Sequence, residues 1–317
     1  MLTFIVRRLL QAIPLLFIIT VISFAIITLA PGDPVYMFVN PDQVAAQDLE
    51  MIRHQLGLDR PVYMRYFIWL WNALHLDFGN SFLTGRPVME MLFEAIPNTL
   101  FLALASTIFA LLIAIPAGII SAIKRNGGWD YAFSTLSFIG MSLPSFWFGL
   151  MLILFFSLKL GILPTAGMRQ NFEQFDLWDR LSHLIMPMVV LGMGAMAGQM
   201  RQLRSAMLEV IRQDYIRTAR SKGLKERVVI LKHALRNALL PTITLLGFII
   251  PGLFGGAVIT ESIFSWPGVG RIAINAAFTR DYPLIMGNLM ITSTMVILGS
   301  LIADVLYAVA DPRIKYN

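Results

Sequence analysis

The sequence lacks cysteine altogether and is poor in charge. With no cysteine among its 317 residues, disulfides, thiolate metal sites and a cysteine nucleophile are excluded, and the redox compartment stays open. Only 14% of the residues are charged, against about a quarter in an ordinary globular protein, and 57% are hydrophobic. This is too little charge to cover a water-facing surface in the usual way. The composition therefore predicts a membrane protein.

Motifs for nucleotide chemistry and metal binding are also missing. The sequence has no G-x-x-x-x-G-K-[ST] phosphate-binding loop, and no G-x-G-x-x-G follows a strand-like run. The four histidines lie in separate segments, with no pair at ligand spacing: His54, His75, His183 and His233. We therefore expect no metal site, no cofactor bound by this chain and no enzymatic activity. Any ATP hydrolysis on which this protein depends must come from another protein.

Long apolar runs are what the sequence does contain. A helix needs about 20 mostly apolar residues to cross a hydrocarbon core of roughly 30 Å. Six runs without an internal charge qualify: 9–30, 99–123, 132–158, 184–200, 238–260 and 283–303. We expect kinks where prolines fall in or near these runs, as at Pro144. The predicted fold class is all-α, a single polytopic membrane domain of six transmembrane helices covering residues 1–317.

The basic residues are distributed unequally between the segments that join these runs. Sixteen of the 25 Lys and Arg residues lie in the termini and the segments that share their side, ten of them between 201 and 236. By the positive-inside rule, both termini are expected in the cytoplasm. The net charge of +6 then lies beside anionic headgroups and cytoplasmic partners, so membrane lipid is an expected partner and nucleic acid is not.

The segment 31–98 is expected to be extracytoplasmic and partly helical. Boundary signals predict one helix from Asp42 to Gly57 and a second from Pro61 to Gly79, whose apolar stripe is typical of an interfacial amphipathic helix. Two roles stay open for this segment. It caps the bundle at headgroup depth, or it forms a platform for a protein that delivers solute.

Ionisable residues are scarce inside the predicted spans. Only Asp304 and Glu261 come close, and each lies toward the end of its span rather than near the midplane. A proton- or sodium-coupled carrier usually places carboxylates near the midplane, in broken helices. The scarcity argues against ion coupling, although a self-sufficient secondary carrier or channel remains the alternative from another functional class.

The segment 201–237 has an amphipathic pattern. Met207, Ile211, Tyr215 and Ala219 recur every four residues and predict one helix, which Gly223 ends. A second helical stretch follows from 224, with apolar residues at 228, 231, 235 and 238. The pattern fits a basic face against lipid headgroups, or a stiff charged protrusion that docks on another protein and transmits motion into the bundle.

Several motifs give the chain a resemblance to a known family. Residues 217–223 read Arg-Thr-Ala-Arg-Ser-Lys-Gly and residues 233–238 read His-Ala-Leu-Arg-Asn-Ala. Together they resemble the coupling loop of ABC-transporter permeases of the dipeptide/oligopeptide/nickel branch. The general superfamily pattern, E-A-A-x3-G-x9-I-x-L-P, is kept only at Ala219 and Gly223. Motifs at 30–34, 56–61, 261–271 and 311–313 extend the resemblance over nearly the whole chain.

The resemblance implies a type I ABC importer permease in a bacterial or archaeal cytoplasmic (inner) membrane. The large insertion after the first span is typical of the oligopeptide or dipeptide permease B-type component. Such a subunit forms half of the translocation path for peptides. It pairs with a second homologous permease, two ATP-binding subunits that bind ATP and Mg²⁺, and an extracytoplasmic solute-binding protein. Import of nickel, glutathione or another small solute is the alternative within the same architecture.

The resemblance also implies functional residues at two places. The ATPase-coupling residues would be Asp214, Tyr215, Arg217, Thr218, Ala219, Arg220, Lys222 and Gly223. An outer gate or receptor contact is expected at Glu261, Trp266, Pro267 and Gly268. Because Trp266-Pro267-Gly268 predicts a tight turn, a structural turn that packs back into the bundle is the alternative there.

Overall fold

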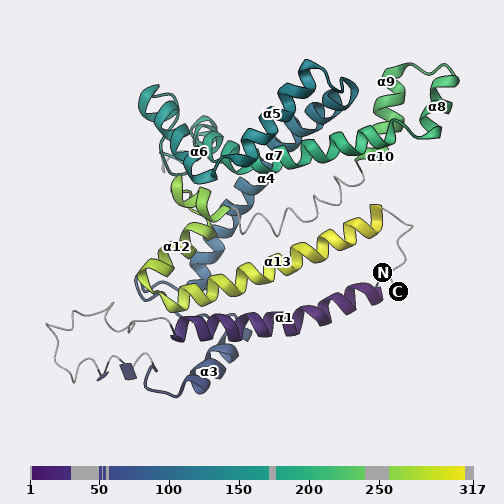
Figure 1. Cartoon of the computed structure of the whole chain (residues 1–317). Coiled ribbons are helices and arrows are strands. Elements are labelled where there is room, and N and C mark those ends of the chain that lie inside the picture. Colours follow the sequence, from purple (N-terminus) through teal and green to yellow (C-terminus); the bar gives the residue numbers. More distant parts are fainter. Residues whose placement is uncertain are drawn as a thin grey trace. The chain divides into compact units, whose positions relative to one another are not determined.

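The computed structural model describes residues 2–29, 50–51, 53–54, 57–170, 176–239 and 257–310. These residues form helices joined by turns and loops, together with an isolated bridge between Asn80 and Pro87 (Figure 1). The main helices are α1 (Leu2–Leu29), α3 (Val62–Leu74), α4 (Val88–Ile123), α5 (Gly128–Ser142), α6 (Ser145–Leu152), α7 (Leu177–Val210), α12 (Val269–Thr279) and α13 (Tyr282–Ala310). The π-helix η2 (Ile153–Lys159) continues α6, and 257–263 are also helical.

Within the described residues, four helices are long and apolar enough to cross a membrane. They contain Val6–Leu29, Val88–Ile123, Leu177–Val210 and Tyr282–Ile302, and so correspond to four of the predicted spans. Two of them extend well beyond the apolar runs. α4 begins eleven residues before Thr99 and includes the exposed Glu90 and Glu94, because a helix can continue past the apolar core of the membrane with a polar surface.

The predicted span at 132–158 is not one straight helix. α5 and the pair α6–η2 are bent by 103° at Leu143 and Pro144. Leu143 has an extended backbone (φ −76°, ψ 126°), the conformation that a following proline favours. This confirms the kink expected at Pro144, and the bent pair counts as a fifth span only if its two halves cross together. Most of the fifth predicted span, 238–260, lies outside the described residues, as does most of the predicted helix 42–57.

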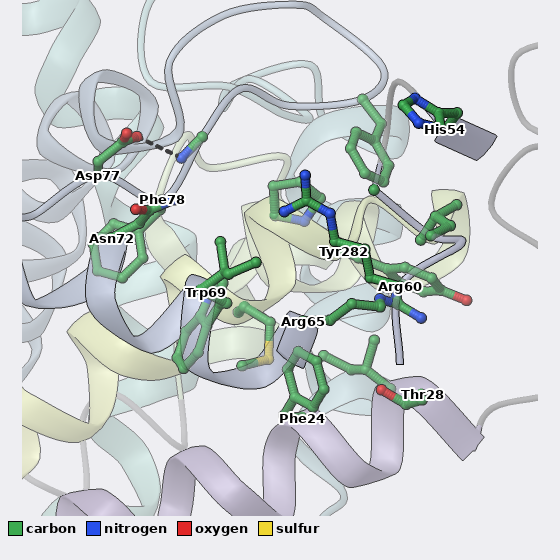
Figure 2. A pocket seen from close by; sticks show the side chains of 18 residues that line it. Phe24, Thr28, His54, Arg60, Arg65, Trp69, Asn72, Asp77, Phe78 and Tyr282 are labelled. Carbon is green, nitrogen blue, oxygen red and sulfur yellow. Dashed lines mark hydrogen bonds between the residues drawn. The ribbon is translucent and has the colours of Figure 1, made fainter. Parts of the chain in front are cut away.

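The chain divides into two compact units, and the first comprises residues 1–99 and 267–298. In it α3 packs on α1, where the Tyr66 hydroxyl lies 2.9 Å from Thr20 Oγ1 and its ring lies edge-on to Phe24. Phe24 and Trp69 also border a cavity (Figure 2). The buried core of this unit consists of Ala73, Phe78, Val88, Leu92, Ala276 and Leu284.

A buried carboxylate fixes the loop before α4 in the first unit. Asp281 is the last residue before α13, and it accepts hydrogen bonds from Ser81 Oγ at 2.5 Å and from the Phe82 N–H at 3.1 Å. A buried carboxylate needs such donors, because an unpaired one is costly. The bonds join residues 200 and 199 positions apart and hold the entry of α4 against the start of α13.

The second unit comprises residues 100–266 and 299–317. α7 is its central helix and packs closely against α4 and α5. At Gly192, an added Cβ would lie 2.8 Å from the Ser106 carbonyl oxygen and from the Phe109 ring, so this approach of α7 to α4 requires glycine. Beyond Val210 the chain leaves α7 and forms the segment that carries the predicted coupling residues.

Candidate coupling site

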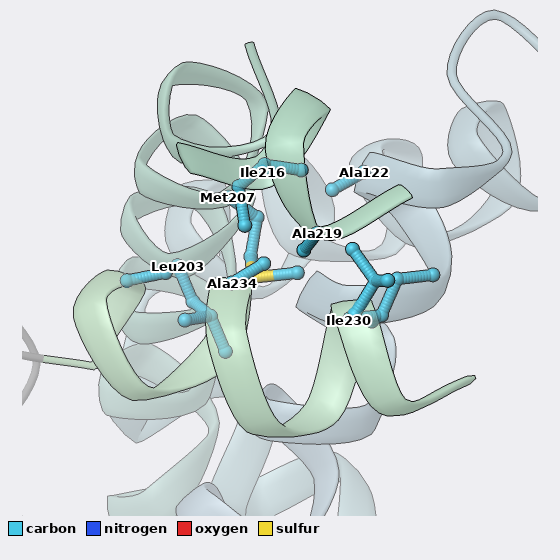
Figure 3. Packing of buried hydrophobic residues seen from close by; sticks show 9 residues of the cluster. Ala122, Leu203, Met207, Ile216, Ala219, Ile230 and Ala234 are labelled. Atoms are coloured by element: carbon cyan, nitrogen blue, oxygen red, sulfur yellow. The ribbon is translucent and has the colours of Figure 1, made fainter. Parts of the chain in front are cut away.

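Residues 211–238 form a helical hairpin on the end of α7, which we call the coupling hairpin. After a turn at 211–213 come α8 (Asp214–Ser221), a turn at Gly223, the short α9 (Glu226–Val228), the π-helix η3 (Val229–Ala234) and α10 (Leu235–Ala238). Figure 3 shows Ile216 and Ala219 directed toward Leu203 and Met207 of α7. The hairpin is therefore attached by a packed core rather than by a single connection.

The single helix predicted through 207, 211, 215 and 219 is wrong. α7 ends at Val210, and the Ile211 and Gln213 N–H groups close a turn onto Met207 and Val210. α8 then begins at Asp214 with a new register. Its buried residues are Ile216 and Ala219, whereas Tyr215 is exposed. Spacing along the sequence could not reveal this change, because the turn contains no glycine or proline.

The buried face of the coupling hairpin forms one apolar cluster with two helices of the second unit. Ile216, Met207, Val229 and Ala234 are completely buried, and Ala122 at the end of α4 belongs to the same cluster (Figure 3). Each large apolar side chain buried in this way contributes about 1.5–3 kcal/mol. α8 is thus fixed to the ends of α4 and α7. Moving it independently of them would cost the free energy that this burial contributes.

The second helical arm of the hairpin, from α9 to α10, also departs from the predicted register. We expected residues 228, 231, 235 and 238 on the apolar face, but Val228 and Leu231 are exposed. Ala238 is buried and Leu235 packs on the cluster as predicted, whereas the other buried residues are Val229, Ile230 and Ala234. A π-helical turn over η3 adds a residue to the turn and shifts the buried side. Such turns often lie at functional positions.

The predicted coupling residues share the solvent-facing side of α8 and its C-terminal turn. Asp214, Tyr215, Arg217, Thr218, Arg220, Lys222 and Gly223 are exposed, and Ala219 alone is buried. Arg217 is 73% exposed and faces Asp214 at 3.5 Å, a pair too open to fix either side chain. Asn237 donates from Nδ2 to the Tyr215 hydroxyl at 2.9 Å and so links α8 to α10. The exposed side of α8 is therefore a basic surface, and the apolar cluster beneath it holds the helix in place.

Gly223 forms the turn between the two arms of the hairpin. Its φ of +76° lies in the left-handed region, which glycine adopts without strain. Its N–H donates to the Arg220 carbonyl at 2.9 Å and ends α8. The stop predicted at this residue is therefore present in the structure.

An ion pair joins the two arms beside this turn. Arg220 donates from Nε and Nη2 to the two carboxylate oxygens of Glu226, at 3.1 and 2.7 Å. These hydrogen bonds lower the pKa of Glu226 below its usual range and raise that of Arg220. Both side chains are about half exposed, so the pair can open toward a partner. Arg220 is thus already engaged within the hairpin, unlike the more open Arg217.

A second ion pair, which the sequence analysis missed, lies beneath the hairpin. Arg204 of α7 donates to both carboxylate oxygens of Asp130 at the start of α5, at 2.7 and 2.8 Å. Asp130 is buried and also accepts hydrogen bonds from Ser121 Oγ and the Asn126 N–H. The cluster ties together the ends of α4, α5 and α7. The only sequence signal was an acidic residue in the first turn after Gly127-Gly128.

The residues predicted for an outer gate or receptor contact are mostly buried. Glu261 and Trp266 are completely buried in the second unit, where the backbone N–H of Trp266 donates to the Glu261 carbonyl at 2.8 Å. In the first unit Gly268 is buried and Pro267 is exposed, with the Pro267 carbonyl accepting from Asn98 Nδ2 at 2.8 Å. The described contacts are those of a packed turn. Asp304 belongs to α13, and its side chain lies outside the described residues.

Comparison with known families accounts for both halves of the chain. Residues 114–316, which include the coupling hairpin, match the family described as "Binding-protein-dependent transport system inner membrane component". Residues 1–103 match the family described as "Binding-prot-dependent transport system membrane comp, N-term". The chain belongs to this family. The permease is thus a multi-pass membrane subunit of an ABC importer, and the predicted resemblance is confirmed.

Individual relatives cover the permease from end to end. It is 48% identical to the oligopeptide transport system permease protein AppB of Bacillus subtilis, over 100% of both chains. It is 41% identical to the di/tripeptide transport system permease protein DppB of Pseudomonas aeruginosa, again over 100% of both. The glutathione transport system permease protein GsiC of Escherichia coli is 39% identical over the same extent.

A solved structure supports the fold. An inward-facing form of the MetNI methionine ABC transporter matches with a TM-score of 0.57 at 19% identity, covering 70% of the permease and 97% of that chain. At this identity the match concerns the fold alone. The all-α type I importer architecture is confirmed, and the family assignment sets aside a self-sufficient ion-coupled carrier or channel.

Proposed function

We propose that this permease forms half of the translocation path of an ATP-dependent peptide importer. Full-length relatives named as oligopeptide and di/tripeptide permeases, at 48% and 41% identity, support peptides as the solute. The observation that carries the transport role is the coupling hairpin, an exposed basic surface on a core continuous with α4 and α7. Import of glutathione, itself a small peptide, is the second candidate, since GsiC is 39% identical.

The partners in this proposal are a second homologous permease, two ATP-binding subunits and an extracytoplasmic solute-binding protein. α8 docks in a groove of one ATP-binding subunit through Asp214, Tyr215, Arg217, Thr218 and Lys222. ATP and Mg²⁺ are bound by those subunits, and this chain holds no cofactor. When the ATP-binding subunits close, α8 is displaced, and its apolar core carries the displacement into the ends of α4 and α7.

The same proposal fixes the topology. The hairpin and both termini are cytoplasmic, in a bacterial or archaeal inner membrane, and 31–98 is extracytoplasmic. Of the four outer residues, Pro267 is the one that a solute-binding protein can contact without rearrangement, because it is exposed. Glu261, Trp266 and Gly268 act in an outer gate only if the turn that holds them opens during the cycle.

Arg217→Glu tests the docking role. Arg217 has no buried contact in the hairpin, so its reversal leaves the fold intact while placing an acidic group on the docking surface. We expect loss of co-purifying ATP-binding subunits and at least about a tenfold loss of labelled peptide uptake in proteoliposomes, since opposing a partner's charge costs several kcal/mol. The matched control is Arg125→Glu, another exposed arginine, which lies outside the hairpin. Normal uptake and co-purification by Arg217→Glu would refute the docking role.

A further inference from the structure

A cavity of about 380 Å³ opens in the first unit where α1 meets α3 and the start of α13. Figure 2 shows Phe24 and Thr28 of α1 at the bottom of the view, and Trp69 of α3, Phe78 and Tyr282 above them. All of the lining residues belong to the first unit. The cavity takes no part in the coupling site, and a volume of this size admits a small molecule or a headgroup.

The polar groups that line this cavity favour a ligand with an anionic hydrogen-bond acceptor. Trp69 Nε1 is buried and has no hydrogen-bond partner in the described part of the chain, although an indole N–H normally finds one. Arg60 and Arg65 line the same cavity with positive charge. Arg65 is already engaged in another interaction, so the argument rests on Arg60 and Trp69. The carboxylate of Asp77 is already occupied by the Gly79 N–H at 2.9 Å.

The exposed surface of α1 beside the cavity favours a ligand with an apolar tail. α1 presents exposed aliphatic side chains up to its end, among them Ile22, Ile26 and Leu29, the last 82% exposed. Only 6% of the most apolar 18-residue stretch of α1 is buried within the described part of the chain. The cavity lies at the last turns of this spanning helix, the depth of lipid headgroups, where tryptophan and arginine are commonly found. A solute passing along a polar path would have no use for this exposed apolar surface.

We propose that the cavity binds the phosphate of a membrane phospholipid. The indole N–H of Trp69 and the guanidinium of Arg60 hold the phosphate, and the acyl chains extend along Ile22 and Ile26 of α1. Anionic phospholipids bind better than zwitterionic ones, because Arg60 adds a positive charge to the cavity and the lining carboxylate, Asp77, is already hydrogen-bonded. In the proposed topology this lipid belongs to the outer leaflet. The site does not depend on which solute is carried.

Native mass spectrometry of the purified permease complex tests this site with dioleoyl phosphatidylglycerol as the probe. Trp69→Phe keeps the ring and removes the N–H donor, and Arg60→Gln removes the charge. Each is expected to weaken binding of the tightest lipid about tenfold, the effect of losing one charge-assisted hydrogen bond. Trp71→Phe is the matched control, because Trp71 lies on the same helix, is exposed and does not line the cavity. Arg60→Lys keeps the charge and should retain most of the affinity.

Two further probes separate lipid from other anions. Glycerol 3-phosphate carries the phosphate without acyl chains, and a dipeptide carries a carboxylate. Both should bind at least about a hundredfold more weakly than the lipid, because each buried methylene of an acyl chain adds to affinity. Equal lipid retention by Trp69→Phe, Arg60→Gln and Trp71→Phe would overturn the proposal. So would tight binding of either acyl-free probe that depends on Trp69 and Arg60.

Discussion

Two arginine–carboxylate pairs with nearly the same geometry lie at opposite ends of the coupling machinery. At the base, Arg204 binds both oxygens of Asp130, and the side chains are 25% and 5% exposed. At the tip, Arg220 binds both oxygens of Glu226, and the side chains are 40% and 54% exposed. Exposure, rather than bond geometry, separates a pair that holds helices together from one that can be exchanged for a partner's groups.

The partners around each pair sharpen the contrast. Asp130 receives additional hydrogen bonds from Ser121 and from the Asn126 backbone, so three helix ends converge on one carboxylate. The Glu226 carboxylate accepts hydrogen bonds from Arg220 alone among the described residues. We infer that the base keeps α4, α5 and α7 in a fixed relation while the tip adapts its contacts when α8 docks.

Removing the charge at the base should have the largest effect. Asp130→Asn keeps the shape of the side chain but leaves Arg204 without its counter-ion, and breaking such a buried pair costs about 3–5 kcal/mol. We expect a lower unfolding temperature of the purified complex and faster hydrogen exchange at the C-terminal end of α7. Ser134→Ala is the control, because Ser134 reaches Asp130 only at 3.4 Å. An unchanged unfolding temperature for Asp130→Asn would mean that the base pair does not hold the helices.

The same contrast explains what could be read from the sequence. Apolar runs locate α1, α4, α7 and α13, because a spanning helix is apolar around most of its circumference and needs no exact register. Gly223 was predictable as well, since a left-handed turn strongly favours glycine. The pair of Asp130 and Arg204 was not, because 74 residues separate the partners and nothing local marks the contact.

The predicted register of the coupling hairpin was wrong for a different reason. The prediction assumed uninterrupted α-helical periodicity, whereas the structure has a turn at 211–213 and a π-helical segment at Val229–Ala234. Each changes the phase without a glycine or proline to signal it. The exposed residues Arg217 and Lys222 were nevertheless predicted on the outer side, because a charged side chain is rarely buried without a partner.

A backbone change at the tip should have an intermediate effect. An added Cβ at Gly223 meets nothing within 4 Å, so Gly223→Ala pays only for the left-handed backbone, about 1–2 kcal/mol. Gly223→Pro is more severe, because proline cannot adopt a φ of +76° and lacks the N–H that donates to Arg220. We expect Gly223→Ala to retain part of the uptake and Gly223→Pro to abolish it, with both variants inserted in the membrane at normal levels.

Uptake assays with quantified membrane insertion distinguish these cases. If Gly223→Pro transports peptide normally, the shape of the turn is irrelevant to coupling, and the tip acts through its charges alone. If Gly223→Ala already abolishes uptake, the coupling hairpin tolerates less distortion than an exposed, adaptable tip implies.

The smallest expected effect concerns the charge pair at the tip. The pKa of Glu226 is lowered from 4.5 by the Arg220 hydrogen bonds, so the pair stabilises the hairpin above pH 4.5 and this contribution is lost as pH falls through the lowered pKa. For an exposed pair the contribution is about 0.5 kcal/mol. The ratio of hydrogen-exchange rates for residues 214–228 in Glu226→Gln and in the unmodified permease should exceed one at pH 7 and approach one at acid pH. In the double variant that exchanges the pair, Arg220→Glu with Glu226→Arg, the hydrogen-exchange rate divided by that of the unmodified permease should return to a value near one at pH 7. A ratio that is the same at both pH values would show that the tip pair contributes nothing, and the comparison with the base would then rest on the buried pair alone.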